Sequence, residues 1–186
     1  MSDDKLPAHL RDDVLDLLKR TERPQTITIV GASMLPLLRA GDRVIVEPRQ
    51  QIQPGAIVVF QQGDQLIAHR VLRIEDRAGQ VVLTTKGDAT WHLDPPVRAD
   101  AILGCAVAIE RGARVLSLDT RAARVIGAWA VAHARVSAPI YAGLLQLKIK
   151  TLGRGSNRVT RGLKNALNIF FDLPHRIQSA GWKERH

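Results

Sequence analysis

Four side chains in this sequence could together perform acyl transfer. They are one serine, one histidine and two aspartates, which lie in the segments Gly31-Ala32-Ser33-Met34-Leu35-Pro36, Ala68-His69-Arg70-Val71 and Thr85-Lys86-Gly87-Asp88, and at Asp94. A serine hydroxyl is a poor nucleophile near neutral pH, so it needs a neighbouring base and a group that orients the base. The sequence therefore holds candidates for all three roles.

Short β-strands are expected to position these side chains. Six segments rich in Val and Ile are separated by turn-forming residues, and they span residues 26–30, 42–46, 56–60, 65–74, 80–85 and 101–109. Strands at such close intervals, without helices between them, predict a mainly β domain over about residues 26–118. Ser33 then follows the first strand, His69 lies in the fourth, and Asp88 follows the fifth.

Helical segments are predicted on both sides of the β domain. Apolar residues recur at helical spacing over residues 6–20, which predicts an N-terminal helix within residues 1–25. After Thr120 the sequence becomes alanine-rich and then basic, which predicts a helical tail over residues 119–186. Within this tail, residues 157–171 are predicted to form a basic amphipathic helix, and Gly153-Arg154-Gly155-Ser156 is predicted to be a flexible joint.

The basic charge of the chain is confined to its C-terminal part. Residues 1–110 hold 13 Lys and Arg against 15 Asp and Glu, a balance of −2, whereas residues 111–186 hold 14 against 3, a balance of +11. Such asymmetry favours contact with an anionic membrane surface through the amphipathic helix 157–171. The alternative is a surface helix packed on the β domain. The absence of interleaved aromatic residues argues against nucleic acid as a partner.

Membrane insertion and metal binding find little support in the sequence. The longest candidate span, residues 125–147, carries Arg135 near its centre, at a cost of roughly 2.5–3.5 kcal/mol. The acidic N-terminus lacks the pattern of a secretory signal, so we expect a cytoplasmic protein or one peripheral to the cytoplasmic membrane. The single cysteine, Cys105, lies in an apolar run and is expected to be buried. Without CxxC or paired His/Cys spacing, we expect no metal or cofactor.

Taken in order, the motifs resemble those of type I signal peptidases. They are Ser-Met-x-Pro, Gly-Asp, Pro-Gly-x-Ile-Val-Val-Phe, His-Arg-Val, and Thr-Lys-Gly-Asp with a later Asp, all within about residues 27–109. The closer similarity is to the endoplasmic-reticulum and archaeal branch, which uses histidine where the main bacterial branch uses lysine. The resemblance implies a signal-peptidase/LexA-like coiled β-sheet core and cleavage of an extended peptide or precursor protein.

The resemblance also implies a role for each candidate residue. Ser33 matches the nucleophile, His69 the general base and Asp94 the aspartate that orients the histidine, while Asp88 either supports the site or substitutes for Asp94. Independently, an ordinary histidine pKa near 6.5 suits a base at neutral pH. Lys86 is a rival base, which the adjacent Asp88 is expected to hold protonated.

Departures from the family pattern leave other functions open. Residues 6–20 replace the usual membrane anchor, and Gly31 replaces a hydroxyl residue that contributes to the oxyanion hole in some relatives. One alternative is a non-enzymatic adaptor that binds a peptide or is tethered to a membrane. Another is a self-cleaving LexA-type regulator, although such proteins use a lysine base and carry an upstream DNA-binding module.

Overall fold

A single antiparallel sheet carries the candidate site. The computed structural model describes residues 23–48, 51–152 and 183–184. Within them, the strands run in the spatial order β1-β2-β7-β3-β4-β5-β6, while β8 pairs with β7 and β9 pairs with β8. Their bounds are β1 Gln25–Thr28, β2 Arg43–Glu47, β3 Ile57–Gln62, β4 Gln65–Arg77, β5 Gln80–Lys86, β6 Val97–Arg98, β7 Ile102–Arg111, β8 Arg114–Ser117 and β9 Lys183–Glu184. A 3-10 turn, Ala99–Ala101, joins β6 to β7.

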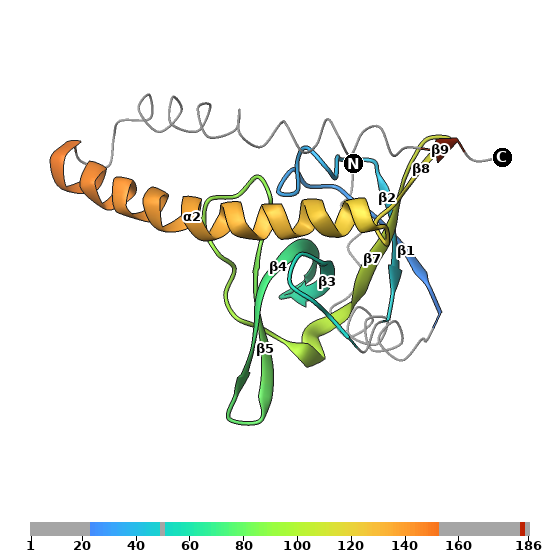
Figure 1. Cartoon of the computed structure of the whole chain (residues 1–186), viewed down its shortest axis with the longest axis horizontal. Helices are drawn as coiled ribbons and strands as arrows, with labels where there is room; N and C mark the ends of the chain where they lie inside the picture. Colours follow the sequence, from blue (N-terminus) through green and yellow to red (C-terminus); the bar gives the residue numbers. More distant parts are fainter. Residues whose placement is uncertain (1–22, 49–50, 153–182, 185–186) are drawn as a thin grey trace, which may run out of the picture.

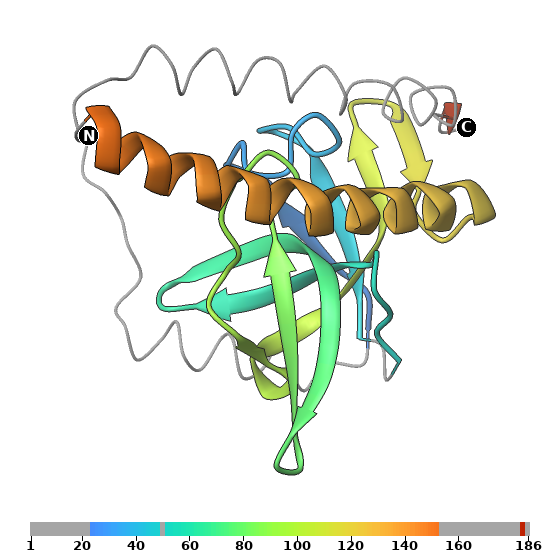
Figure 2. The same ribbon diagram turned by 60° about the vertical axis from the view of Figure 1, so that its left-hand side comes forward.

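Tight turns set the register of the hairpins. Between β4 and β5, Ala78 and Gly79 both have positive φ, at 54° and 80°, which suits the right-handed twist of the two strands. The Asp76 carboxylate accepts a hydrogen bond from the Gly79 N–H at 2.7 Å. The hairpin that results extends well beyond the rest of the sheet (Figure 2).

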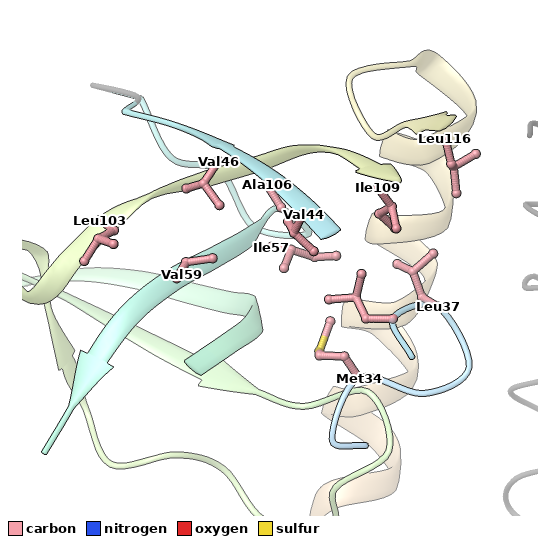
Figure 3. Packing of buried hydrophobic residues seen from close by; sticks show 11 residues of the cluster. Met34, Leu37, Val44, Val46, Ile57, Val59, Leu103, Ala106, Ile109 and Leu116 are labelled. Atoms are coloured by element: carbon pink, nitrogen blue, oxygen red, sulfur yellow. The ribbon is translucent and has the colours of Figure 1, made fainter. Parts of the chain in front are cut away.

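Two groups of buried side chains form the core of the sheet. The first lies between the strands and the segment that follows β1, where Met34 and Leu37 lie against Val44, Ile57 and Ile109 (Figure 3). The second gathers residues from β3, β4, β5, β6 and β7, namely Val58, Phe60, Val71, Leu83, Val97 and Cys105. The expected burial of Cys105 is confirmed, since its exposed fraction is 4%.

One long helix, α2 (Arg121–Leu152), crosses the β-sheet body and continues past it (Figures 1 and 2). The Thr120 hydroxyl caps its start by accepting a hydrogen bond from the Ala123 N–H at 3.1 Å. Val131 and Ala134 pack on Leu72 of β4. At Gly127 the helix meets the turn before β3, because a Cβ there would lie 2.8 Å from the Gly55 carbonyl oxygen. Only a glycine permits this approach.

The predicted fold class is confirmed, since the molecule is a mainly antiparallel β-sheet with a helix on its C-terminal side. All six predicted strands are present with bounds shifted by a few residues. Short strands β6, β8 and β9 were not predicted. The predicted helices 6–20 and 157–171 lie outside the described residues, so the division into segments 1–25, 26–118 and 119–186 stays a prediction. No helix among the described residues is both long and apolar enough to cross a bilayer.

Candidate active site

Ser33 lies in the segment that leads from β1 into a turn, and hydrogen bonds fix this segment on both sides. Before the serine, the Ile29 N–H donates to the Asp42 carbonyl at 2.8 Å, and the Gly41 N–H donates to the Ile29 carbonyl at 2.8 Å. At the serine itself, the Ala89 N–H donates to the Ser33 carbonyl at 2.8 Å. Met34 is buried in the core beneath, so the half-buried Ser33 side chain has a fixed backbone.

An ion pair between the buried Asp42 and the half-buried Arg111 holds the turn that follows Ser33. The Arg111 guanidinium donates to both carboxylate oxygens of Asp42, at 2.7 and 2.6 Å, and to the Leu37 carbonyl at 3.0 Å. Asp42 also accepts a hydrogen bond from the Arg39 N–H at 2.8 Å. Arg111 ends β7, so the pair ties the Ser33 turn to the middle of the sheet.

His69 lies within β4 opposite Val58 of β3, and its ring is nearly enclosed. The residue is 6% exposed, and the ring stands edge-on to Phe60 with centroids 6.2 Å apart. Its Nε2 lies 2.9 Å from Ser33 Oγ, and its Nδ1 lies 2.6 Å from Asp94 Oδ2. Three side chains far apart in the sequence therefore form one continuous Ser33–His69–Asp94 array.

The chemistry of the array fixes the direction of its hydrogen bonds. An ionised carboxylate only accepts hydrogen bonds, so His69 Nδ1–H donates to Asp94. In a neutral imidazole the other nitrogen then accepts, so the Ser33 hydroxyl donates to Nε2. In this arrangement the imidazole can remove the proton of Ser33 as its oxygen attacks a carbonyl carbon.

Asp94 reaches His69 because the chain folds back onto β5. The Asp94 N–H donates to the Thr85 carbonyl at 3.0 Å, and the Thr85 hydroxyl donates to Asp94 Oδ2 at 2.7 Å. Sequence reasoning gave Thr85 no role. It also gave none to Gly87, although a Cβ at Gly87 would lie 2.6 Å from the Ser33 carbonyl oxygen and 2.9 Å from His69 Nε2. Both Thr85 and Gly87 lie in the Thr-Lys-Gly-Asp motif, which is the sequence signal that could have indicated them.

Asp88 lies apart from the array. Its carboxylate accepts two hydrogen bonds from Arg70, from Nε at 2.9 Å and from Nη2 at 2.6 Å, and both side chains are buried. Arg70 Nη1 also donates to the Gly55 carbonyl at 2.8 Å. Of the two roles expected for Asp88, this geometry corresponds to support of the site, while Asp94 takes the position at His69. Arg70 thus holds Asp88 and the turn at Gly55 together.

Burial lowers the pKa of Lys86 below its ordinary value, while the charges of Asp88 and Asp94 act in the opposite direction. The expectation that Asp88 holds Lys86 protonated stays a prediction. The repulsive charge of Arg70 lowers the pKa further. The Lys86 ammonium donates to the Gly87 carbonyl at 3.1 Å. Sequence adjacency showed the carboxylate beside Lys86 but not the depth at which both are buried.

An open groove of about 420 Å³ runs past Ser33 and His69. It is lined by residues 27–31, by residues 62 and 65–69 of the β3–β4 hairpin, and by residues 90, 92, 94 and 95. Of these lining residues, Val30 and Leu66 are exposed apolar side chains. Among the described residues, the lining contains no lysine or arginine, and its one carboxylate, that of Asp94, is bonded to His69 and Thr85. The groove is therefore suited to an uncharged, extended chain.

Comparison with known proteins finds similarity to a peptidase family. The family model described as Peptidase S24-like matches residues 7–91, a range that includes Ser33, His69 and Asp88 and ends shortly before Asp94. No curated protein matches the chain. Residues 7–91 are thus similar to the Peptidase S24-like family, and the chain carries a peptidase-like fold.

Proposed function

We propose that this protein is a serine endopeptidase, similar to the type I signal peptidases that use histidine as the base. The observation that carries the proposal is the Ser33–His69–Asp94 array, in which the hydroxyl, imidazole and carboxylate are joined by contacts of 2.9 and 2.6 Å. The first of these distances is within the reach of a general base. The array also opens onto the groove, where a peptide carbonyl can approach Ser33.

In the proposed mechanism His69 accepts a proton and then donates it, once while the acyl-enzyme forms and once while it is hydrolysed. Ser33 Oγ attacks the carbonyl carbon of the scissile bond while His69 Nε2 takes the hydroxyl proton. The imidazolium then gives that proton to the departing amine, which leaves an acyl-enzyme ester on Ser33. Water attacks the ester while His69 takes one of its protons, and this proton passes to Ser33 Oγ as the acid product leaves. Asp94 stabilises each imidazolium through Nδ1–H.

Stabilisation of the oxyanion is assigned to backbone donors around Ser33. Gly31 has no side chain to contribute, and a Cβ built there would have no atom within 4 Å. Loss of one oxyanion-hole donor costs around 2.7–4 kcal/mol in an enzyme that has two, so we expect modest turnover. Addition of a hydroxyl by Gly31→Ser is compatible with the space.

The groove favours a substrate bound as an extended strand. β1 pairs with β2 on one side, and residues 65–69 of β4 pair with β3, while the pairing with β5 begins at Arg70. The groove lies between these two strand segments. A peptide placed there can pair with backbone groups, and shallow apolar sites can accept its alternate side chains. We therefore propose small uncharged residues before the cleaved bond.

The test is cleavage of a peptide that contains a small-x-small sequence. Ser33→Ala and His69→Ala are each expected to abolish turnover, and Asp94→Asn to lower kcat by about 10⁴-fold by favouring the wrong tautomer. Ser117→Ala and His133→Ala serve as matched controls away from the groove and should cleave at the wild-type rate. Wild-type turnover by the Ser33 or His69 variant would disprove the assignment.

The Peptidase S24-like match favours a second candidate, a regulator that cleaves its own chain. Self-cleavage would appear in intact mass as a slow, Ser33-dependent cut whose rate does not change with protein concentration. Covalent labelling of Ser33 by a serine-directed acylating probe would exclude the third possibility, a non-enzymatic adaptor for peptides. A chain that is neither labelled nor able to cleave a peptide would favour the adaptor.

A further inference from the structure

We propose that Thr85 is a positioning residue for Asp94 and, through Asp94, for the ring of His69. The inference rests on the proposed function for its catalytic consequence, but its structural part stands on hydrogen bonds alone. Thr85 is 0% exposed, and it makes two bonds to the same residue: its hydroxyl donates to Asp94 Oδ2 at 2.7 Å, and its carbonyl accepts the Asp94 N–H at 3.0 Å.

Both side-chain bonds of Asp94 converge on one oxygen atom. His69 Nδ1 lies 2.6 Å from Oδ2, and Thr85 Oγ1 lies 2.7 Å from that same oxygen. The hydroxyl of Thr85 therefore decides where the acceptor for His69 lies. Without it, the carboxylate can rotate about its own bond to the chain, and Nδ1–H loses a fixed partner. The ring orientation that presents Nε2 to Ser33 depends on that partner.

The register of the sheet explains why Thr85 is the residue in this position. Thr85 pairs with Val71 across the β4–β5 ladder, and His69 lies two residues before Val71 along β4. Side chains two residues apart share a face of a strand, so Thr85 and His69 project from the same face. Asp94 then bridges them. A buried hydroxyl without a partner costs about 1–3 kcal/mol, so the bond to Asp94 also satisfies Thr85.

A positioning role makes a specific kinetic prediction. Thr85 is absent from the lining of the groove, so its loss should leave KM close to the wild-type value. Loss of the hydroxyl should instead lower kcat by on the order of 10–100-fold. This is the range found when a group that orients a metal-bound histidine is removed, and Thr85 acts on His69 in a comparable way through Asp94. Thr85→Val removes the hydroxyl at nearly constant shape, and Thr85→Ser keeps it. We expect the serine variant to retain activity within about threefold of wild type, since its hydroxyl can make the same bond.

The adjacent residue supplies a matched control. Thr84 is half-buried in the same strand and points to the other face, so Thr84→Val removes a hydroxyl that does not bond to Asp94. This variant should have wild-type kcat, KM and thermal stability. If Thr85→Val fails to fold, Thr85→Ala compared with Thr85→Ser makes the same contrast with smaller side chains.

A spectroscopic measurement separates this proposal from the proposed function. Long-range ¹H–¹⁵N spectra report which nitrogen of His69 carries the proton, and they need no substrate. We expect the Nδ1–H form in the wild type, Thr85→Ser and Thr84→Val, and a mixture of tautomers in Thr85→Val. A His69 spectrum in Thr85→Val identical to that of wild type would overturn the positioning role. Absence of peptide cleavage by the wild type would overturn the proposed function and leave this comparison valid.

Discussion

Strands β4 and β5 carry two polar clusters that differ in kind although their residues alternate along the same backbone. His69 and Thr85 belong to the array that opens onto the groove, whereas their neighbours Arg70 and Lys86 form a buried cluster with Asp88. Because successive side chains of a strand point to opposite faces, one pair of strands can hold both. The array and the buried cluster are therefore separated by a single residue step along each strand.

The two clusters also differ in how their charges are held. Arg70 donates two hydrogen bonds to Asp88 and a third to the Gly55 carbonyl, and these bonds hold all three groups in place. In the array, by contrast, the Ser33 hydroxyl bonds to His69 and faces the groove, where its proton can move. We therefore expect substitutions in the buried cluster to change mainly stability, and those in the array to change mainly turnover.

The largest effect on stability is expected from breaking the buried ion pair. Arg70→Met removes both hydrogen bonds that Arg70 donates to the buried Asp88 carboxylate, which should cost about 3–5 kcal/mol in the free energy of unfolding. The double variant Arg70→Met/Asp88→Leu should recover part of this loss, because the carboxylate is removed together with Arg70, while the buried Lys86 loses the attraction of Asp88. Denaturant unfolding measures both. Arg98→Met, which breaks an exposed pair with Asp100, is the control and should leave stability unchanged.

Turnover of Arg70→Met tests whether the buried cluster acts separately from the array. If Arg70→Met keeps wild-type stability but loses turnover, the buried cluster takes part in the chemistry and the separation described above is wrong. If turnover falls only with the fraction of unfolded protein, the cluster is structural.

Smaller changes in stability are expected when two glycines of α2 are replaced by alanine. The two changes should have opposite signs. Gly127→Ala places a Cβ 2.8 Å from the Gly55 carbonyl oxygen, which must displace the helix from the turn that Arg70 also holds. We expect a loss of about 1–3 kcal/mol from overpacking. Gly143→Ala meets open space and should instead stabilise the helix by up to about 1 kcal/mol. Thermal unfolding of both variants measures the contrast, and equal shifts would show that α2 does not press on Gly55.

The smallest effect is expected from His133, which stacks on Trp129 of α2. Burial, and then the charge of Lys86, hold the pKa of His133 below its ordinary value of 6.5. The folded state therefore binds fewer protons than the unfolded state near that pH, and stability should fall as the pH drops through 6.5.

The melting temperature at a series of pH values tests this effect. Between about pH 8 and about pH 5.5 the wild type should lose more stability than His133→Gln, which has no proton to gain there. His92→Gln, at an exposed position, should retain the wild-type loss. If the melting temperature of His133→Gln depends on pH as that of the wild type does, protonation of His133 does not affect stability.

Much of the fold followed from the sequence because its strands are long enough to show a pattern. The segments of β2, β3, β4, β5 and β7 each carry several Val and Ile residues between turn formers, whereas β6 is too short for any periodicity to appear. The positions of Ser33, His69 and Asp94 in the sequence were visible through their motifs. Their mutual distances depend on long-range pairing, which no local pattern contains.

The parts that sequence reasoning missed depend on burial and on chain reversal. Asp88 lies two residues after Lys86 in the sequence, yet the effect of desolvation on Lys86 depends on how deeply the folded chain buries both side chains. The role of Thr85 requires the return of the chain at Asp94. Membrane contact through residues 157–171 stays a prediction, since that segment lies outside the described residues.

The pairing of β9 with β8 has a practical consequence for handling this protein. Lys183 and Glu184 lie opposite Val115 and Arg114, while the other side of β8 is occupied by β7. A shortened version that stops before Lys183 would leave backbone donors and acceptors of β8 open to another molecule, an arrangement that promotes edge-to-edge aggregation. Expression trials that shorten the basic tail should therefore delete residues from within it and retain β9.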